Sequence, residues 1–173
     1  MRRRPVTWSV LAVLVVLLGI GAWAFQPWRL WTQRTVEEAL PPAPATSAPP
    51  VPGTTPPPGP VDLAAGTFVS QEHRTSGTAR VVRLPDGSRV LRLENLSTSD
   101  GPDLHVWLTD QSAGGDWGKY DDGRHLALGP LKGNHGNQNY PVPPEADLAG
   151  LTSVVIWCDR FNVAFGSAPL ALG

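Results

Sequence analysis

Apolar and polar residues alternate in short stretches from residue 61 to the C-terminus, which is the pattern of β-strands. Leu104, Val106 and Leu108 alternate with His105 and Trp107, so one side of that strand should face the main core. Similar stretches predict strands at 66–70, 78–84, 89–94, 125–131, 140–142 and 169–172, with a hairpin turn at 85–88. No helical period occurs after residue 61. The predicted fold is therefore all-β, an antiparallel β-sandwich of about eight or nine short strands.

Two further strands are predicted in residues 153–166, where Asp159 and Arg160 interrupt the apolar run. If these two residues form a hairpin loop, Cys158 lies opposite Phe161 and its sulfur is reachable. If the strand continues through Arg160, the thiol points into the core. We favour the hairpin, because a new alternating pattern begins at Phe161.

The N-terminal region reads as a membrane anchor. Residues 6–25 are uncharged and mostly apolar, and as a helix they would span about 30 Å. Arg2, Arg3 and Arg4 should hold residues 1–5 in the cytoplasm, so that the rest of the chain is extracytoplasmic. A cleaved signal peptide is the alternative, since Ala22-Trp23-Ala24 resembles a processing site. The length of the run and its flanking tryptophans favour a retained, single-pass helix.

Two segments separate this helix from the β-domain, which is expected at 61–173. Residues 26–40 mix apolar and charged side chains, which suits either a short amphipathic segment on the outer leaflet or a frayed end of the helix. Ten of the twenty residues 41–60 are proline. Such a stretch is typical of a semi-rigid linker, and we expect it to hold the domain away from the membrane.

Charge and cysteine content narrow the function classes. Residues 61–173 contain nine Lys or Arg and thirteen Asp or Glu, and this acidic balance argues against nucleic acid as a partner. A single cysteine excludes an internal disulfide and a zinc site built from cysteines. There is also no Gly-rich phosphate loop and no recognisable Ser/His/Asp arrangement, so a hydrolytic enzyme is not supported.

Four ordered motifs resemble the DM-thirteen domain family over about 110 residues. They are Gly66-Thr67-Phe68, residues 101–108, residues 128–143, and Val154 to Cys158 followed by 161–166. In animals the family occurs beside DOMON domains in Skeletor-type proteins, and in bacteria behind a membrane anchor. The resemblance implies an all-β module with a role in redox or electron transfer, through the cysteine that corresponds to Cys158 or through a prosthetic group such as haem.

Cys158 is accordingly the first candidate site residue, as a reactive thiol or an axial ligand. An unpaired thiol outside the cytoplasm is expected to be buried, ligated or reactive, and an inert core residue is the plain alternative. His105 and His135 are candidate second ligands for haem iron or copper. The plain alternatives are that His105 is a half-exposed strand residue and that His135 is a solvated loop residue. His73 and His125 carry less weight.

Two loops are candidate binding surfaces. Gly101 and Asp103 follow Asp100 in an acidic turn that could hold calcium or a sugar hydroxyl, although such residues more often shape the turn. Lys132, Asn134 and Tyr140 belong to a Gly- and Asn-rich stretch suited to carbohydrate or peptide, or simply to a structural crossover.

Two functions follow. The first is an anchored redox module acting through Cys158 or a group that it ligates, with a redox partner at the cell surface. The second is a non-catalytic binding or scaffold module for a cell-envelope component or a protein partner.

Overall fold

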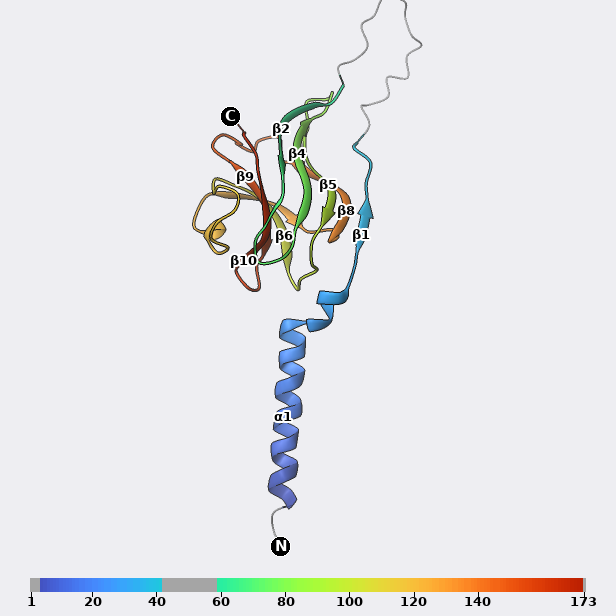
Figure 1. Cartoon of the computed structure of the whole chain (residues 1–173), viewed down its shortest axis with the longest axis vertical. Coiled ribbons are helices and arrows are strands. Elements are labelled where there is room, and N and C mark those ends of the chain that lie inside the picture. The colour runs from blue at the N-terminus through green and yellow to red at the C-terminus, as the bar shows by residue number, and fades with distance from the viewer. Residues whose placement is uncertain (1–3, 42–58, 173) are drawn as a thin grey trace, which may run out of the picture.

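Two five-stranded sheets form the β-domain in this computed structural model, which describes residues 4–41 and 59–172. One sheet has the order β1-β8-β5-β4-β2 and the other β3-β10-β9-β6-β7. All neighbouring strands are antiparallel except β1 and β8. The predicted all-β sandwich is confirmed (Figure 1).

The described elements, in chain order, have the following bounds: α1 Arg4–Phe25, η1 Pro27–Trp31 (a 3-10 helix), β1 Thr35–Glu37, β2 Val61–Thr67, β3 Val69–Ser70, β4 Ser76–Arg83, β5 Arg89–Ser97, β6 Leu104–Thr109, η2 Lys119–Asp121 (a 3-10 helix), β7 His125–Pro130, β8 His135–Val142, β9 Ser153–Cys158 and β10 Val163–Pro169. The predicted turn between β4 and β5 is present, with Gly87 at φ 84° and the Asp86 side chain accepting hydrogen bonds from Ser88.

Several boundaries differ from the sequence prediction. The stretch at 66–70 is divided between the two sheets, because the chain crosses from β2 to β3 at the buried Phe68. The predicted strand at 169–172 is wrong, since β10 ends at Pro169 and the following leucines only fill the core. The Gly- and Asn-rich stretch is a loop only as far as Asn134, and β8 begins at His135.

The main core lies between the sheets, where every second side chain of the strands points inward. A second, smaller core covers the other side of the β9–β6 pair. Its members, all buried, are Trp107, Tyr120, Val155, Trp157 and Ala164. This explains why Trp107 alternates with the inward-facing residues of β6 and is nevertheless buried.

The segment before the Pro-rich stretch belongs to the β-domain, which the sequence analysis missed. Residues 26–40 were expected to be an amphipathic segment on the outer leaflet or a frayed end of the helix. They instead include η1 and β1, and β1 pairs with β8 in the register Thr35 to His135. Gly136, at φ 98°, permits this close approach, because a Cβ atom there would overlap the carbonyl oxygen of Val36.

The two ends of the Pro-rich stretch meet the same sheet. Strand β1 precedes it and β2 follows it, at opposite edges. The predicted extended conformation falls largely on residues 42–58, which lie outside the described residues. However, the chain is already docked on the domain before residue 41, so this stretch does not set the distance between the domain and α1.

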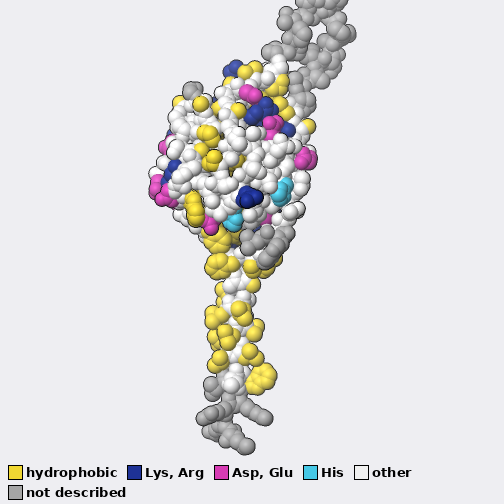
Figure 2. Space-filling view, in the orientation of Figure 1, with side chains coloured by type: hydrophobic (Ala, Val, Ile, Leu, Met, Phe, Trp, Pro, Cys, Tyr) yellow, Lys and Arg dark blue, Asp and Glu magenta, His cyan; other side chains and the backbone are white. Residues whose placement is uncertain are grey.

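Helix α1 extends away from one end of the sandwich (Figure 1). Hydrophobic side chains cover it along its length (Figure 2). The span Thr7–Phe25 has 19 residues and a mean hydropathy of 2.3, which is long and apolar enough to cross a membrane. A signal sequence near an N-terminus has the same properties.

Candidate functional site

Cys158 is the last residue of β9, and its side chain is completely buried in the main core. It lies opposite Leu104 of β6 and Val163 of β10. The favoured hairpin is present, but its loop has four residues, 159–162, so Cys158 does not face Phe161. Our expectation of a reachable sulfur is therefore wrong.

Burial also makes this thiol a poor nucleophile. It raises the pKa of the Cys158 thiol, and nearby backbone N–H groups of Phe161, Arg160 and Asp103 oppose the rise only in part. A thiol that stays protonated and enclosed cannot attack a partner or ligate a metal without opening the core.

The three predicted cofactor ligands do not converge. His105 lies next to Leu104 on β6, so its side chain projects from the sheet face opposite to Cys158. His135 begins β8 in the other sheet, between Thr35 of β1 and Ser97 of β5. Haem held by Cys158 together with either histidine does not fit this arrangement.

His105 instead meets two carboxylates. Its Nε2 atom lies 3.0 Å from Asp103 Oδ1 and 3.5 Å from Asp159 Oδ2, and one donor atom from each residue lies within 4.8 Å of the others. Asp103 and Asp159 come from neighbouring loops, which are joined because Asp159 N–H donates to the Asp103 carbonyl at 3.0 Å. Among the described residues this is the one cluster of three such donors.

The donor chemistry of this Asp103–His105–Asp159 cluster suits a transition metal. One imidazole and two carboxylates offer nitrogen and oxygen ligands, which copper(II), iron, manganese and zinc accept. The carboxylates are exposed and the imidazole is half-buried, so an ion can enter from solvent. Residue type marked His105 as a candidate metal ligand and Asp103 as a candidate for calcium or a sugar hydroxyl, whereas Asp159 was noted only as a neighbour of Cys158.

The predicted binding residues separate into two groups. Gly101, Asp103 and Asn134 line a small pocket of about 170 Å³ together with Arg29 and Arg34. Lys132 and Tyr140 do not line it. The Lys132 amine binds Glu38 at 2.8 Å and the carbonyl of Asn139 at 2.7 Å.

Tyr140 is a core residue and cannot offer a surface ring, because only 2% of it is exposed. Its hydroxyl donates to Gln138 and accepts from the backbone N–H of Lys132. Burial raises the pKa of Tyr140 to about 12. The expectation that Tyr140 contributes to a binding surface is therefore wrong.

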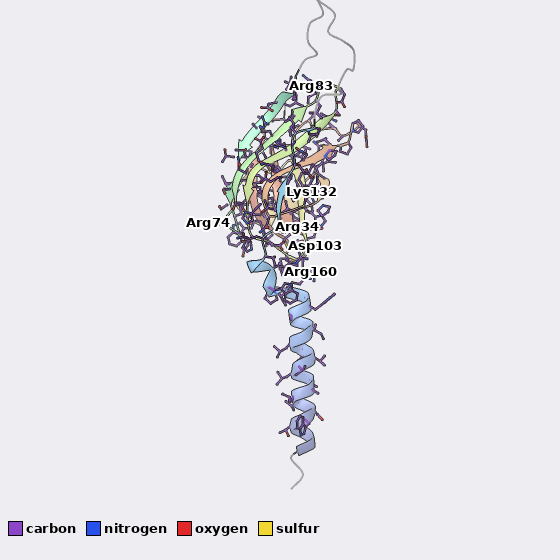
Figure 3. The ribbon with its side chains drawn as sticks, turned by 90° about the vertical axis from the view of Figure 1, so that its right-hand side faces the viewer. Arg34, Arg74, Arg83, Asp103, Lys132 and Arg160 are labelled. Carbon is purple, nitrogen blue, oxygen red and sulfur yellow. The ribbon has the colours of Figure 1, made fainter. Side chains whose placement is uncertain are left out.

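The end of α1 contacts the same loops that carry the metal-binding candidates. Phe25 stacks on Phe161 with ring centroids 5.7 Å apart, and Arg160 donates to the carbonyl of Ala24 at 3.0 Å. Arg29 in turn donates to the carbonyl of Gly101 at 2.8 Å. Figure 3 shows Asp103 and Arg160 at the end of the domain nearest α1, and Arg83 at the far end.

An aromatic row lies on the face of the sheet from which His105 projects. His105 pairs directly with Trp157, whose ring centroid is 5.2 Å from that of Trp107. The ring of His125 stacks on Trp107 at 4.1 Å. The row thus continues from the Asp103–His105–Asp159 cluster along the second core.

The sequence model of a family described as electron transfer DM13 matches residues 67–170, which is more than half of the chain. The chain belongs to the DM13 electron-transfer family. Comparisons with curated proteins and with solved structures gave no match. The resemblance seen in the sequence is thereby confirmed, and the matched residues include the whole Asp103–His105–Asp159 cluster and Cys158.

Proposed function

We propose that this chain is a single-pass membrane protein whose DM13 domain transfers single electrons at the outer surface of the cytoplasmic membrane. The apolar α1 and the arginines that precede it favour a cytoplasmic N-terminus. The contacts of Arg160 with Ala24 and of Phe161 with Phe25 favour retention of α1 over its cleavage, because they join the helix to the domain.

The redox group that we propose is one copper or iron ion bound by Asp103, His105 and Asp159. The observation that carries this proposal is the convergence of three donor atoms within 4.8 Å, in a domain of an electron-transfer family. Cys158 does not take part directly. Its carbonyl accepts hydrogen bonds from the N–H groups of Phe161 and Asn162, which shapes the loop that presents Asp159.

A copper or iron ion held by Asp103, His105 and Asp159 would supply one-electron redox chemistry, with a reduced partner as the electron donor and an oxidised partner as the acceptor. Two carboxylates favour the more highly charged state of the ion, and the imidazole supplies a nitrogen ligand. The adjoining Trp157 and Trp107 rings offer a route from the cluster along the domain.

Copper titration of the full chain in detergent micelles tests this proposal. We expect one Cu(II) ion per chain, seen by electron paramagnetic resonance with nitrogen coupling from a single imidazole. His105→Ala should weaken binding at least about tenfold and remove that coupling. His135→Ala is the matched control and should behave as the wild type. An unchanged signal in His105→Ala, or no specific copper or iron binding, would contradict the redox proposal.

A second candidate is a non-catalytic binding module for a cell-envelope component. The pocket lined by Gly101, Asp103 and Asn134 favours it, because two arginines and two aspartates offer polar groups there. Under this candidate His105→Ala would leave the cellular effect of the protein intact, whereas removing a cationic group from the pocket by Arg34→Ala would abolish it.

A further inference from the structure

An apolar cavity lies where α1 meets the β-domain. It has a volume of about 470 Å³, in the range of small-molecule sites. Aromatic side chains from four separate parts of the chain line it: Phe25, Trp117, Phe161 and Phe165. None of these was singled out as a site residue in the sequence, because only the tertiary structure brings them together.

We infer that this cavity binds the ring of a membrane-soluble quinone. The inference rests on the proposed function, since it names the membrane partner of an electron-transfer domain. The cavity wall includes Phe25 and Pro27, the end of α1 and the beginning of η1. A ligand dissolved in the bilayer would therefore find the cavity at the point where the helix leaves the membrane, and its apolar tail could remain in the lipid.

The exposed aromatic residues around the cavity support a flat apolar occupant. Trp117 is 47% exposed and Phe161 is 40% exposed, although large aromatic side chains are usually covered. Phe161 already stacks on Phe25, and a quinone ring would bury these faces by the same stacking geometry.

His73 supplies the polar contact that distinguishes a quinone from a lipid acyl chain. Its ring packs on Phe165 with centroids 3.9 Å apart, and its side chain has no hydrogen-bond partner among the described residues. Burial lowers the pKa of His73, and the nearby Glu72 opposes this effect. A neutral imidazole keeps one N–H group, which can donate to a quinone carbonyl.

The cavity adjoins the metal-binding candidates. Residues 100–102 line it and lead directly into Asp103, and Phe161 lies two residues beyond Asp159. A ring in the cavity would therefore lie beside the two loops that carry Asp103 and Asp159.

Binding of decylubiquinone and of a short-chain menaquinone to the full chain in phosphatidylglycerol nanodiscs tests the inference. Val163 lines the cavity from β10, and Val163→Trp should fill it and weaken quinone binding at least about tenfold. Val61→Trp is the matched control, because Val61 is an exposed strand residue outside the cavity. It should bind quinone as the wild type does. His73→Gln should weaken binding about fivefold without filling the cavity.

Wild-type quinone affinity in both Val163→Trp and His73→Gln would overturn the inference. So would binding of a fluorescent fatty acid in the cavity that quinone does not displace. Copper binding by the same samples separates the two proposals. Loss of quinone binding in Val163→Trp, with the His105-dependent copper signal intact, supports the quinone cavity. If the wild type binds no quinone but keeps that copper signal, only the electron-transfer proposal stands.

Discussion

The side-chain oxygen of Asn134 accepts a hydrogen bond of 2.7 Å from the backbone N–H of Arg34, one hundred residues earlier in the chain. The amide group of Asn134 also donates to the carbonyls of Thr32 and Thr98. One buried side chain thus joins the segment after η1 to the sandwich. The residue was predicted to bind a partner, and its described contacts are with its own chain.

Asn134→Ala should therefore release β1 from the sheet. The substitution leaves the Arg34 N–H and two carbonyls without their partner, and we expect a loss of about 2–3 kcal/mol in the free energy of unfolding. Urea unfolding followed by tryptophan fluorescence measures it. Asn137→Ala removes a more exposed amide, which bonds Glu37 of β1 and the backbone N–H of Asn95. Water can replace these exposed bonds, so its effect should be below about 1 kcal/mol. An equal loss of unfolding free energy in the two variants would show that Asn134 does not hold β1 on the sheet.

Shortening the Pro-rich stretch should leave both the fold and the height of the domain above the membrane unchanged. Deletion of residues 47–55 retains eleven residues between 41 and 60, which reach about 36 Å when extended. Only four strand spacings of about 4.8 Å separate β1 from β2 across the sheet, so the shortened stretch still reaches from one strand to the other. The expected change in unfolding free energy is below about 1 kcal/mol.

Energy transfer from a label on the domain to a lipid-surface acceptor measures the height of the domain above the membrane. A shift of the domain toward the membrane in the deletion variant would restore the spacer interpretation made from composition. The undeleted chain with the same label is the control.

Tyr140 should make the domain sensitive to alkali. Burial raises the pKa of Tyr140 from its usual value of about 10 to about 12, so folding favours the neutral hydroxyl. The stabilisation is fully present below pH 10, decreases as the pH rises from 10 to 12, and amounts to about 3 kcal/mol over that range. Unfolding free energies measured against pH should show this decline, and Tyr140→Phe should make the curve flatter. A wild-type curve as flat as that of the variant would contradict the assignment.

Cys158 should be unreactive in the folded protein. Because the thiol is buried and its pKa is raised, we expect labelling by a maleimide to be at least about a hundredfold slower in the native chain than in urea. Phe161→Cys in a Cys158→Ala background places a thiol on the exposed loop and should label rapidly. Fast labelling of native Cys158 would revive the direct thiol mechanism.

The sequence by itself determined the features that depend on local pattern. Alternation along β6 identified a strand and its inward face, and the turn at Pro85–Ser88 identified a hairpin. The apolar run at 6–25 identified the helix. Each of these signals depends only on residues that are neighbours in the sequence. The ordered motifs around Asp103, His105 and Cys158 identified the family for the same reason. His105 and Asp103 were likewise found as candidate ligands by residue type.

Only the tertiary structure decided which of these residues meet. A hairpin at Cys158 was predicted, but two more residues in its loop place Val163 opposite the thiol and close the core over it. Asp159 joins His105 through the antiparallel pairing of β6 with β9, and Thr35 joins His135 across the Pro-rich stretch. Strand pairing and burial are set by the packing of distant segments against one another, and this information is not contained in the spacing of residues along a single chain.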